Sequence, residues 1–279
     1  MAGASMKDIK LRIRSVENTM QITKAMQLVA SSKLRGARRR MEDSRPYLET
    51  ARRVISEIAA HNTGSVSAFL TPREVKRRCV VVIAGDRGLA GSYNANVFKA
   101  AGELFDVETC VLPIGRKAKE RYVRGDCRLI DSDIQKVDGL TAKQCEPVAR
   151  ELMRGFKAGE YDEVCLVYTT FVSVLTQKPR VARLLPVEHG ESERMGRQMI
   201  FEPGVDALLN RFLPEYLAGA IYAAACDSVA SEQAARRVAM DSATKNAGEM
   251  IEDLSLRYNR ARQGSITQEI TEIVAGSEH

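Results

Sequence analysis

The sequence from residue 6 to residue 58 reads MKDIKLRIRSVENTMQITKAMQLVASSKLRGARRRMEDSRPYLETARRVISEI, and its apolar residues recur at alternating steps of three and four. The row is apolar except at Thr23, Gln27 and Ser44, and it contains no Lys, Arg, Asp or Glu. A 3.5-residue repeat kept over this length is typical of a coiled-coil seam. The segment therefore predicts one long helix that packs along a second helix. The row consists of Met6, Ile9, Ile13, Val16, Met20, Thr23, Gln27, Ala30, Leu34, Ala37, Met41, Ser44, Leu48, Ala51, Ile55 and Ile58.

The other end of the chain offers a partner helix. No proline follows Pro214, which predicts a helix from Glu215 to Ala275. Residues 1–60 carry 13 Lys and Arg against 6 Asp and Glu, whereas residues 208–279 carry 7 against 10. We therefore predict that the two ends pair antiparallel, a basic helix against an acidic one. The predicted seam of the C-terminal helix consists of Met240, Thr244, Ala247, Ile251, Leu254, Tyr258, Ala261, Ile266, Ile270 and Ile273.

Pro46 leaves the continuity of the first helix open, because a proline inside a helix removes a hydrogen bond and can kink it. The small residues that are dense between Ala218 and Ala235 allow another backbone to approach closely. A globule of this length has no interior long enough to bury two such seams separately, so they are expected to bury each other.

Residues 72–204 have a different pattern, with short β-branched runs alternating with helical stretches. This alternation is typical of a mostly parallel sheet covered on both faces. The predicted fold class is therefore α/β: a long antiparallel coiled coil of the two end helices (1–60 and 208–279) plus a Rossmann-like, mostly parallel domain (72–204). The expected strands are Cys79–Ala84, Glu108–Ile114, Cys127–Ile130, Val164–Tyr168 and, after a Lys178–Arg180 turn, an edge strand Val181–Leu185. The expected helices are Ala95–Leu104, Arg116–Val123 and Thr141–Phe156.

A glycine-rich loop follows the first predicted strand, with Gly85, Gly88 and Gly91 at a spacing of three. This spacing is neither the dinucleotide-binding pattern nor the P-loop pattern. A structural turn, held by Asp86 and Asn94, is favoured over nucleotide binding.

The composition argues against catalysis and against a metal or cofactor. Six cysteines and three histidines show no metal-ligand spacing, and no nucleophile motif is present. We expect no cofactor, no catalytic residue and no direct membrane insertion, since no apolar run has the length of a membrane span. The basic stretch 33–40 lacks the interleaved aromatic residues typical of nucleic-acid binding, so no nucleic-acid partner is expected.

Four stretches carry a resemblance to a known family. Residues 13–26 (IRSVENTMQITKAM), 85–94 (GDRGLAGSYN), 258–270 (YNRARQGSITQEI) and 272–276 (EIVAG) closely resemble the gamma subunit of the rotary F-type ATP synthase, in the family's order. Two departures are Ala90, where many members have Cys, and Ser277, where Ala commonly stands. The Cys-bearing insert of the chloroplast form is absent, which argues against redox switching. The chain begins at the family's N-terminus without a leader, which favours a bacterial source.

The resemblance implies a central-stalk rotor subunit that catalyses nothing itself. Its helix pair would stand inside a ring of alpha and beta subunits, and its α/β domain would form a foot bound to epsilon and to the c-subunit ring. The complex would work in ATP synthesis and hydrogen ion transport, with this chain peripheral on the cytoplasmic face of the cell membrane.

The resemblance also points to residues. Arg262 and Gln263 are expected to make polar contacts with a beta-subunit loop. Further coupling contacts would come from Lys24 and Met26 on the first helix and from Thr267 and Glu269 on the last. Phe201 and Glu202 match the family's stretch that faces epsilon and the c ring. Two other classes of protein stay open: a Rossmann-like nucleotide-binding enzyme with coiled-coil dimerisation arms, and a coiled-coil nucleic-acid binder.

Overall fold

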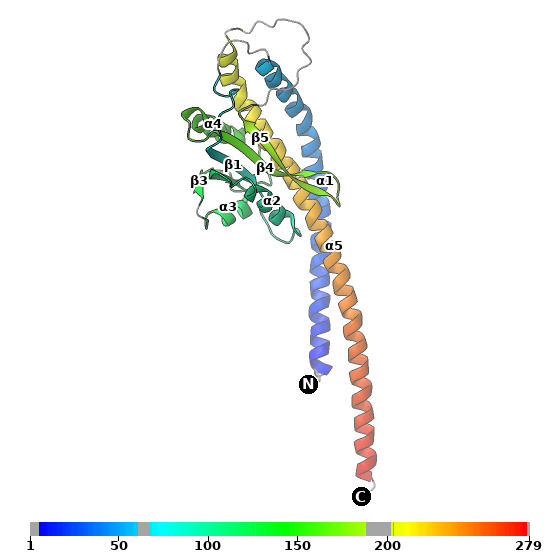
Figure 1. The fold of residues 1–279 in the computed structure, drawn as a ribbon. Helices are drawn as coiled ribbons and strands as arrows, with labels where there is room; N and C mark the ends of the chain where they lie inside the picture. The colour runs from blue at the N-terminus through cyan, green and yellow to red at the C-terminus, as the bar shows by residue number, and fades with distance from the viewer. Residues whose placement is uncertain (1–5, 61–66, 126, 188–201, 203, 278–279) are drawn as a thin grey trace. The chain divides into compact units, whose positions relative to one another are not determined.

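A computed structural model describes residues 6–60, 67–125, 127–187, 202 and 204–277 (Figure 1). The described residues divide into two compact units. The helical unit combines those of Met1–Ala30 with those of Arg237–His279, and the α/β unit comprises those of Ser31–Arg236. Two helices, α1 (Met6–Ala60) and α5 (Val205–Ser277), contribute to both units.

In the helical unit, α1 and α5 run antiparallel and are joined by hydrogen bonds. The hydroxyl oxygens of Thr23 and Thr244 lie 2.8 Å apart, and Gln27 Nε2 donates to Asp241 Oδ1 at 2.8 Å. From the first bonded pair to the second, the residue number rises along α1 and falls along α5, so the helices are antiparallel. Thr23 and Gln27 of the heptad row thus bond across the seam, whereas Ser44 donates to the Met41 carbonyl of its own helix.

The heptad row of α1 is the buried face of the helix in both units. None of its sixteen members is exposed, and Ala30, Leu34, Ala37 and Met41 are among those fully buried. The predicted coiled-coil seam is confirmed. The helix also continues through Pro46, because packing on both sides of the proline outweighs its cost of about 3 kcal/mol.

The prediction that the α5 seam continues to Ile273 is wrong. Ile266, Ile270 and Ile273 are 47%, 57% and 71% exposed. The register that sets Thr23 opposite Thr244 brings the start of α1 opposite residue 261 or so. Beyond that point no described residue of α1 is available to cover these isoleucines.

The α/β unit contains a five-stranded sheet in the order β3-β2-β1-β4-β5. Pairs β1–β2, β1–β4 and β2–β3 are parallel and β4–β5 is antiparallel, which confirms the mostly parallel α/β domain. The strands are β1 (Arg77–Ile83), β2 (Glu108–Ile114), β3 (Arg128–Leu129), β4 (Glu163–Phe171) and β5 (Gln177–Leu185). The helices between them are α2 (Tyr93–Gly102), α3 (Arg116–Tyr122) and α4 (Ala142–Ala158).

Alternate residues of β1 face two different cores. Val80 and Val82 pack with side chains of α2 and α3, whereas Val81 and Ile83 join a larger core with α4 and with the α/β-unit segments of α1 and α5. Figure 1 shows α2 and α3 on one side of the sheet and α4, α1 and α5 on the other. The segment of α5 between Leu217 and Arg236 lies between α1 and the sheet, so all its residues are buried or half-buried.

Two boundaries differ from the sequence predictions because of prolines. The predicted turn Lys178–Arg180 lies inside β5, where Pro179 pairs with Thr169. Since β5 is an edge strand that pairs only with β4, the missing N–H of the proline does not interrupt the sheet. Likewise α5 begins at Val205 rather than Glu215, and it contains Pro214 within its first turns.

Candidate coupling surface and loop network

The C-terminal part of α5 presents an exposed surface within the helical unit. Arg262 and Gln263 are exposed, and their side chains make no hydrogen bond or ion pair with any other described residue. Thr267 Oγ1 donates to the Gln263 carbonyl at 2.9 Å, and Glu269 accepts from Ser265 Oγ at 3.4 Å. Thr267 and Glu269 therefore bond along α5 rather than across to α1.

Sequence reasoning missed the apolar part of this surface. Ile266, Ile270 and Ile273 stand at helical spacing beside the Arg262–Gln263 pair and are all exposed. A contiguous exposed apolar stripe marks an interaction site. We call these three isoleucines together with Arg262 and Gln263 the C-terminal surface. The sequence signal for this surface was the greater predicted length of the last helix, because in an antiparallel pair its excess residues extend beyond the first helix.

The other predicted coupling residues lie elsewhere on the helical unit. Lys24 is exposed and Met26 is half-buried on α1. In the antiparallel register, Lys24 lies opposite residue 243 or so, about 30 Å along the helix from Arg262. The structure therefore places the predicted residues in two separate clusters. The second cluster has its own exposed apolar residues, namely Ile22, Leu28 and Val29.

Of the two predicted foot residues, Phe201 lies outside the described residues. Glu202 is exposed, in a bend shortly before α5. The three histidines of the chain, at 61, 189 and 279, also fall outside the described residues.

The glycine-rich loop of the α/β unit is held by its own polar groups. Gly85 N donates to Asn94 Oδ1 at 2.9 Å, and the Gly85 carbonyl accepts from Lys117 N at 3.0 Å. The Asp86 carboxylate accepts from the backbone amides of Arg116, Val137 and Asp138 at 3.0–3.3 Å.

A buried ion pair on α5 closes the loop from the other side. Arg236 Nη2 donates to Glu232 Oε1 at 2.5 Å, and also to the carbonyls of Arg87 and Gly88 at 3.4 and 3.2 Å. Glu232 is 3% exposed and Arg236 is 7% exposed. Burial raises the pKa of Glu232, and the Arg236 charge opposes this shift. A Cβ at Gly85 would lie 2.8 Å from Glu232 Cδ, so a side chain there would displace the buried Glu232 carboxylate.

This geometry gives the loop a structural role rather than that of a phosphate cradle. A cradle needs several backbone N–H groups pointing at the ligand, but Gly85 N is bonded to Asn94 and two loop carbonyls face the Arg236 guanidinium. Gly91 adopts a φ of +56°, as its position in the tight turn demands. Gly88 has open space around its Cα and contributes its carbonyl.

A second carboxylate of α5, that of Asp227, is mostly buried, and its hydrogen bonds and nearby positive charge do not fully offset the cost of its burial. Asp227 Oδ1 has no hydrogen-bond partner among the described residues, and its ion-pair partner Arg45 on α1 lies 4.0 Å away. Burial raises the pKa of Asp227 to about 6, while Arg45 and a backbone hydrogen bond from Phe171 act in the opposite direction.

Because the folded-state pKa of Asp227 lies above its unfolded value of 3.8, the folded state holds this proton more tightly. The free energy of unfolding should therefore fall as pH rises from about 4 to about 6 and stay level above that. We expect Asp227→Asn to stabilise the protein by ~1–2 kcal/mol at pH 8 and by almost nothing at pH 4. Urea unfolding of both proteins at several pH values measures this difference. A difference that does not change with pH would contradict it.

The six cysteines are free, and no group of His, Cys, Asp and Glu among the described residues could hold a metal ion. Within the part of the chain that the structure describes, no helix combines the length and apolarity of a membrane span. The fold and its surfaces thus define the class of protein: a helix pair with exposed side chains, joined to an α/β unit.

Comparisons with known proteins specify the class. The family model described as ATP synthase matches residues 5–279. The ATP synthase gamma chain of Ruminococcus albus is 47% identical, covering 98% of both chains. The gamma chain of Acetobacterium woodii, named sodium ion specific, is 40% identical, also over 98% of both. Among solved structures, a chain of the Euglena gracilis mitochondrial ATP synthase matches with a TM-score of 0.72 at 19% identity, covering 98% of this chain and 93% of the other. At that identity the match shows the fold.

The chain therefore belongs to the ATP synthase family, among its gamma chains. It is a non-catalytic central-stalk subunit of a membrane-bound F-type ATP synthase, in which catalysis belongs to the beta subunits.

Proposed function

We propose that this chain couples ion flow through a c-subunit ring to ATP synthesis and hydrolysis by turning, as a helix pair, inside a ring of alpha and beta subunits. Moving one charge through a membrane potential supplies about 2.3 kcal/mol per 100 mV. Several translocations must therefore be combined mechanically before one catalytic site releases ATP. A rotor of two packed helices can do this, because each of its orientations presents different side chains to otherwise similar sites and so shifts their conformations.

The single observation that carries this proposal is the exposed C-terminal surface. In a chain that catalyses nothing, three exposed isoleucines beside a guanidinium that bonds to no other described residue indicate a partner that covers them. Arg262 suits a carboxylate on that partner, because a planar guanidinium can bind both carboxylate oxygens. We assign the beta subunits to this surface, together with contacts from Thr267 and Glu269. Lys24 and Met26 would contact the same ring at a second level.

The α/β unit would bind epsilon and the c ring, with Phe201 and Glu202 at that contact and Gly85, Asp86, Gly88, Gly91 and Asn94 shaping the loop beside α5. Residues 1–60, 72–204 and 208–279 would then serve as first helix, foot and last helix. The subunit would lie peripherally on the cytoplasmic face of the cell membrane, bound through its complex. One relative is named sodium ion specific, so the family includes complexes that transport different ions. We assign the choice between hydrogen and sodium ions to the other subunits.

Replacing Ile266, Ile270 and Ile273 with serine tests the assignment in the reconstituted complex. Burying each isoleucine at an interface contributes about 1.5–3 kcal/mol. We therefore expect ion pumping per ATP hydrolysed to fall at least about fivefold in vesicles. Deleting residues 262–279 should impair coupling or assembly further, while the isolated chain keeps its α/β fold by circular dichroism.

The matched control is Met250→Ser, since Met250 is also exposed on α5 but, at 3.6 residues per turn, faces the opposite side of the helix from the three isoleucines. It should leave coupling unchanged. Full coupling in the triple serine variant would refute the role of this surface. Micromolar nucleotide binding or intrinsic turnover by the isolated chain would instead favour the Rossmann-like enzyme.

A further inference from the structure

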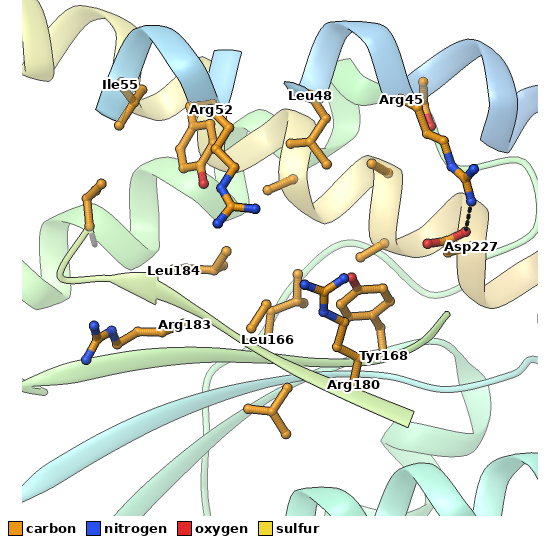
Figure 2. A pocket seen from close by; sticks show the side chains of 18 of the residues that line it. Arg45, Leu48, Arg52, Ile55, Leu166, Tyr168, Arg180, Arg183, Leu184 and Asp227 are labelled. Atoms are coloured by element: carbon orange, nitrogen blue, oxygen red, sulfur yellow. Dashed lines mark ion pairs between the residues drawn. The ribbon is translucent and has the colours of Figure 1, made fainter. Parts of the chain in front are cut away.

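A cavity of about 320 Å³ lies inside the α/β unit, where α1 and α5 cross the outer part of the sheet. Its floor, on the sheet side, is apolar and includes the fully buried Leu166 and Leu184, and Leu48 of α1 lies on the facing wall (Figure 2). Small side chains of α5, among them Ala220 and Ala224, form one wall. A volume of this size lies within the range of small-molecule pockets and would hold about ten water molecules at roughly 30 Å³ each.

The rim of the cavity is cationic. Figure 2 shows Arg52, from α1, and Arg180, from β5, extending toward the space between these two elements from opposite walls. Neither side chain makes a hydrogen bond or an ion pair with any other described residue. Arg45 is in a different position, because it faces the one carboxylate of the cavity, that of Asp227, at 4.0 Å. Asp227 acts on both Arg45 and Arg180, so the four guanidinium groups that line the cavity, including those of Arg52 and Arg183, share one carboxylate and leave an excess of positive charge.

Two guanidinium groups facing one another over an apolar floor recognise a particular chemistry. Guanidinium groups bind phosphate and carboxylate oxygens through paired, charge-assisted hydrogen bonds. The apolar floor adds favourable burial for an aliphatic group. A wholly polar anion would leave the leucines without a partner, and a neutral apolar molecule would leave both guanidinium groups unused.

We propose that this cavity binds a small amphiphilic anion, with its phosphate or carboxylate head group between Arg52 and Arg180 and a short aliphatic body against Leu48, Leu166 and Leu184. The site is separate from the C-terminal surface, which belongs to the helical unit. It is also separate from the glycine-rich loop. Nothing in the proposal depends on the coupling role of the chain.

Isothermal titration of the purified full-length chain tests the proposal with four probes. Octyl phosphate and octanoate carry the two head groups on aliphatic bodies of similar length, inorganic phosphate is a head group alone, and octyl glucoside carries the octyl body with a neutral head group. We expect saturable one-to-one binding of octyl phosphate or octanoate, with inorganic phosphate and octyl glucoside at least about tenfold weaker. Which of the two anions binds more tightly identifies the head group.

The double variant Arg52→Gln/Arg180→Gln should weaken binding of the preferred anion at least about tenfold. Both residues are exposed, so the fold should persist, which circular dichroism verifies. Arg53→Gln is the matched control, because Arg53 is the exposed neighbour of Arg52 and does not line the cavity. Three results would overturn the proposal: no saturable binding of either amphiphilic anion, equal binding of octyl glucoside, or equal loss of affinity in Arg53→Gln.

Discussion

Arg236→Ala is expected to lower the free energy of unfolding by about 3–5 kcal/mol, because it leaves the Glu232 carboxylate buried without its counter-charge. Glu232 is 3% exposed, so water cannot replace the lost guanidinium. The same substitution removes the donor to the carbonyls of Arg87 and Gly88. Equilibrium urea unfolding of the full chain, followed by circular dichroism, measures the loss.

The neighbouring Arg237→Ala is the control, since Arg237 is exposed on the same helix and should change stability by no more than about 0.5 kcal/mol. A second variant separates the unpaired charge from lost packing. Replacing both partners, Glu232→Leu with Arg236→Met, should destabilise less than Arg236→Ala alone, because no buried charge remains unpaired. A double variant at least as unstable as Arg236→Ala would show that the ion pair itself is not the cause.

Gly115→Ala is expected to cost a similar amount, about 3–5 kcal/mol, at the point where β2 gives way to α3. Gly115 has φ 94° and ψ 151°, a combination that is essentially restricted to glycine. A Cβ there would also lie 2.2 Å from the carbonyl oxygen of Ala84 and 2.7 Å from Val137 Cγ2. The Ala84 carbonyl belongs to the backbone that follows β1, so it cannot move aside like the end of a flexible side chain.

Gly102→Ala provides the comparison, because Gly102 ends α2 with ordinary backbone angles and open space where its Cβ would lie. Alanine at that position should be neutral or stabilising by up to about 1 kcal/mol. Thermal unfolding of the two variants and of the unmodified chain measures the change in stability that each substitution causes. A Gly115→Ala protein as stable as the Gly102→Ala protein would mean that the turn tolerates a side chain by rearranging.

The features that could be predicted from the sequence are those set by local periodicity. The 3.5-residue row of α1 determined its buried face, since a seam depends only on spacing along one helix. The β-branched run of β1 likewise predicted a buried parallel strand. Pro179 was misjudged because its effect depends on whether the strand is central or at an edge, and strand order is a property of the whole sheet.

The candidate site was harder to predict, because its residues gain meaning only from tertiary placement. An isoleucine at a seam position looks the same whether α1 or another chain covers it, so the exposure of Ile270 required the register of the two helices. Glu232 and Arg236 stand four residues apart, the spacing of an ion pair along a helix, and that spacing was the available signal. Their role became clear only when the glycine-rich loop was seen against them. The functional roles of Arg262 and Gln263 stay predictions.

The paired threonines and the Gln27–Asp241 bond of the helical unit also restrict sliding. A displacement of seven residues would preserve an apolar seam, yet it would set Thr23 against Ile251 or Arg237 and Gln27 against Gly248 or Ala234. Each half-buried polar group left without a partner would cost about 1–3 kcal/mol. Twist applied to one end of the helical unit is therefore resisted by side-chain pairing instead of being relieved by axial slippage.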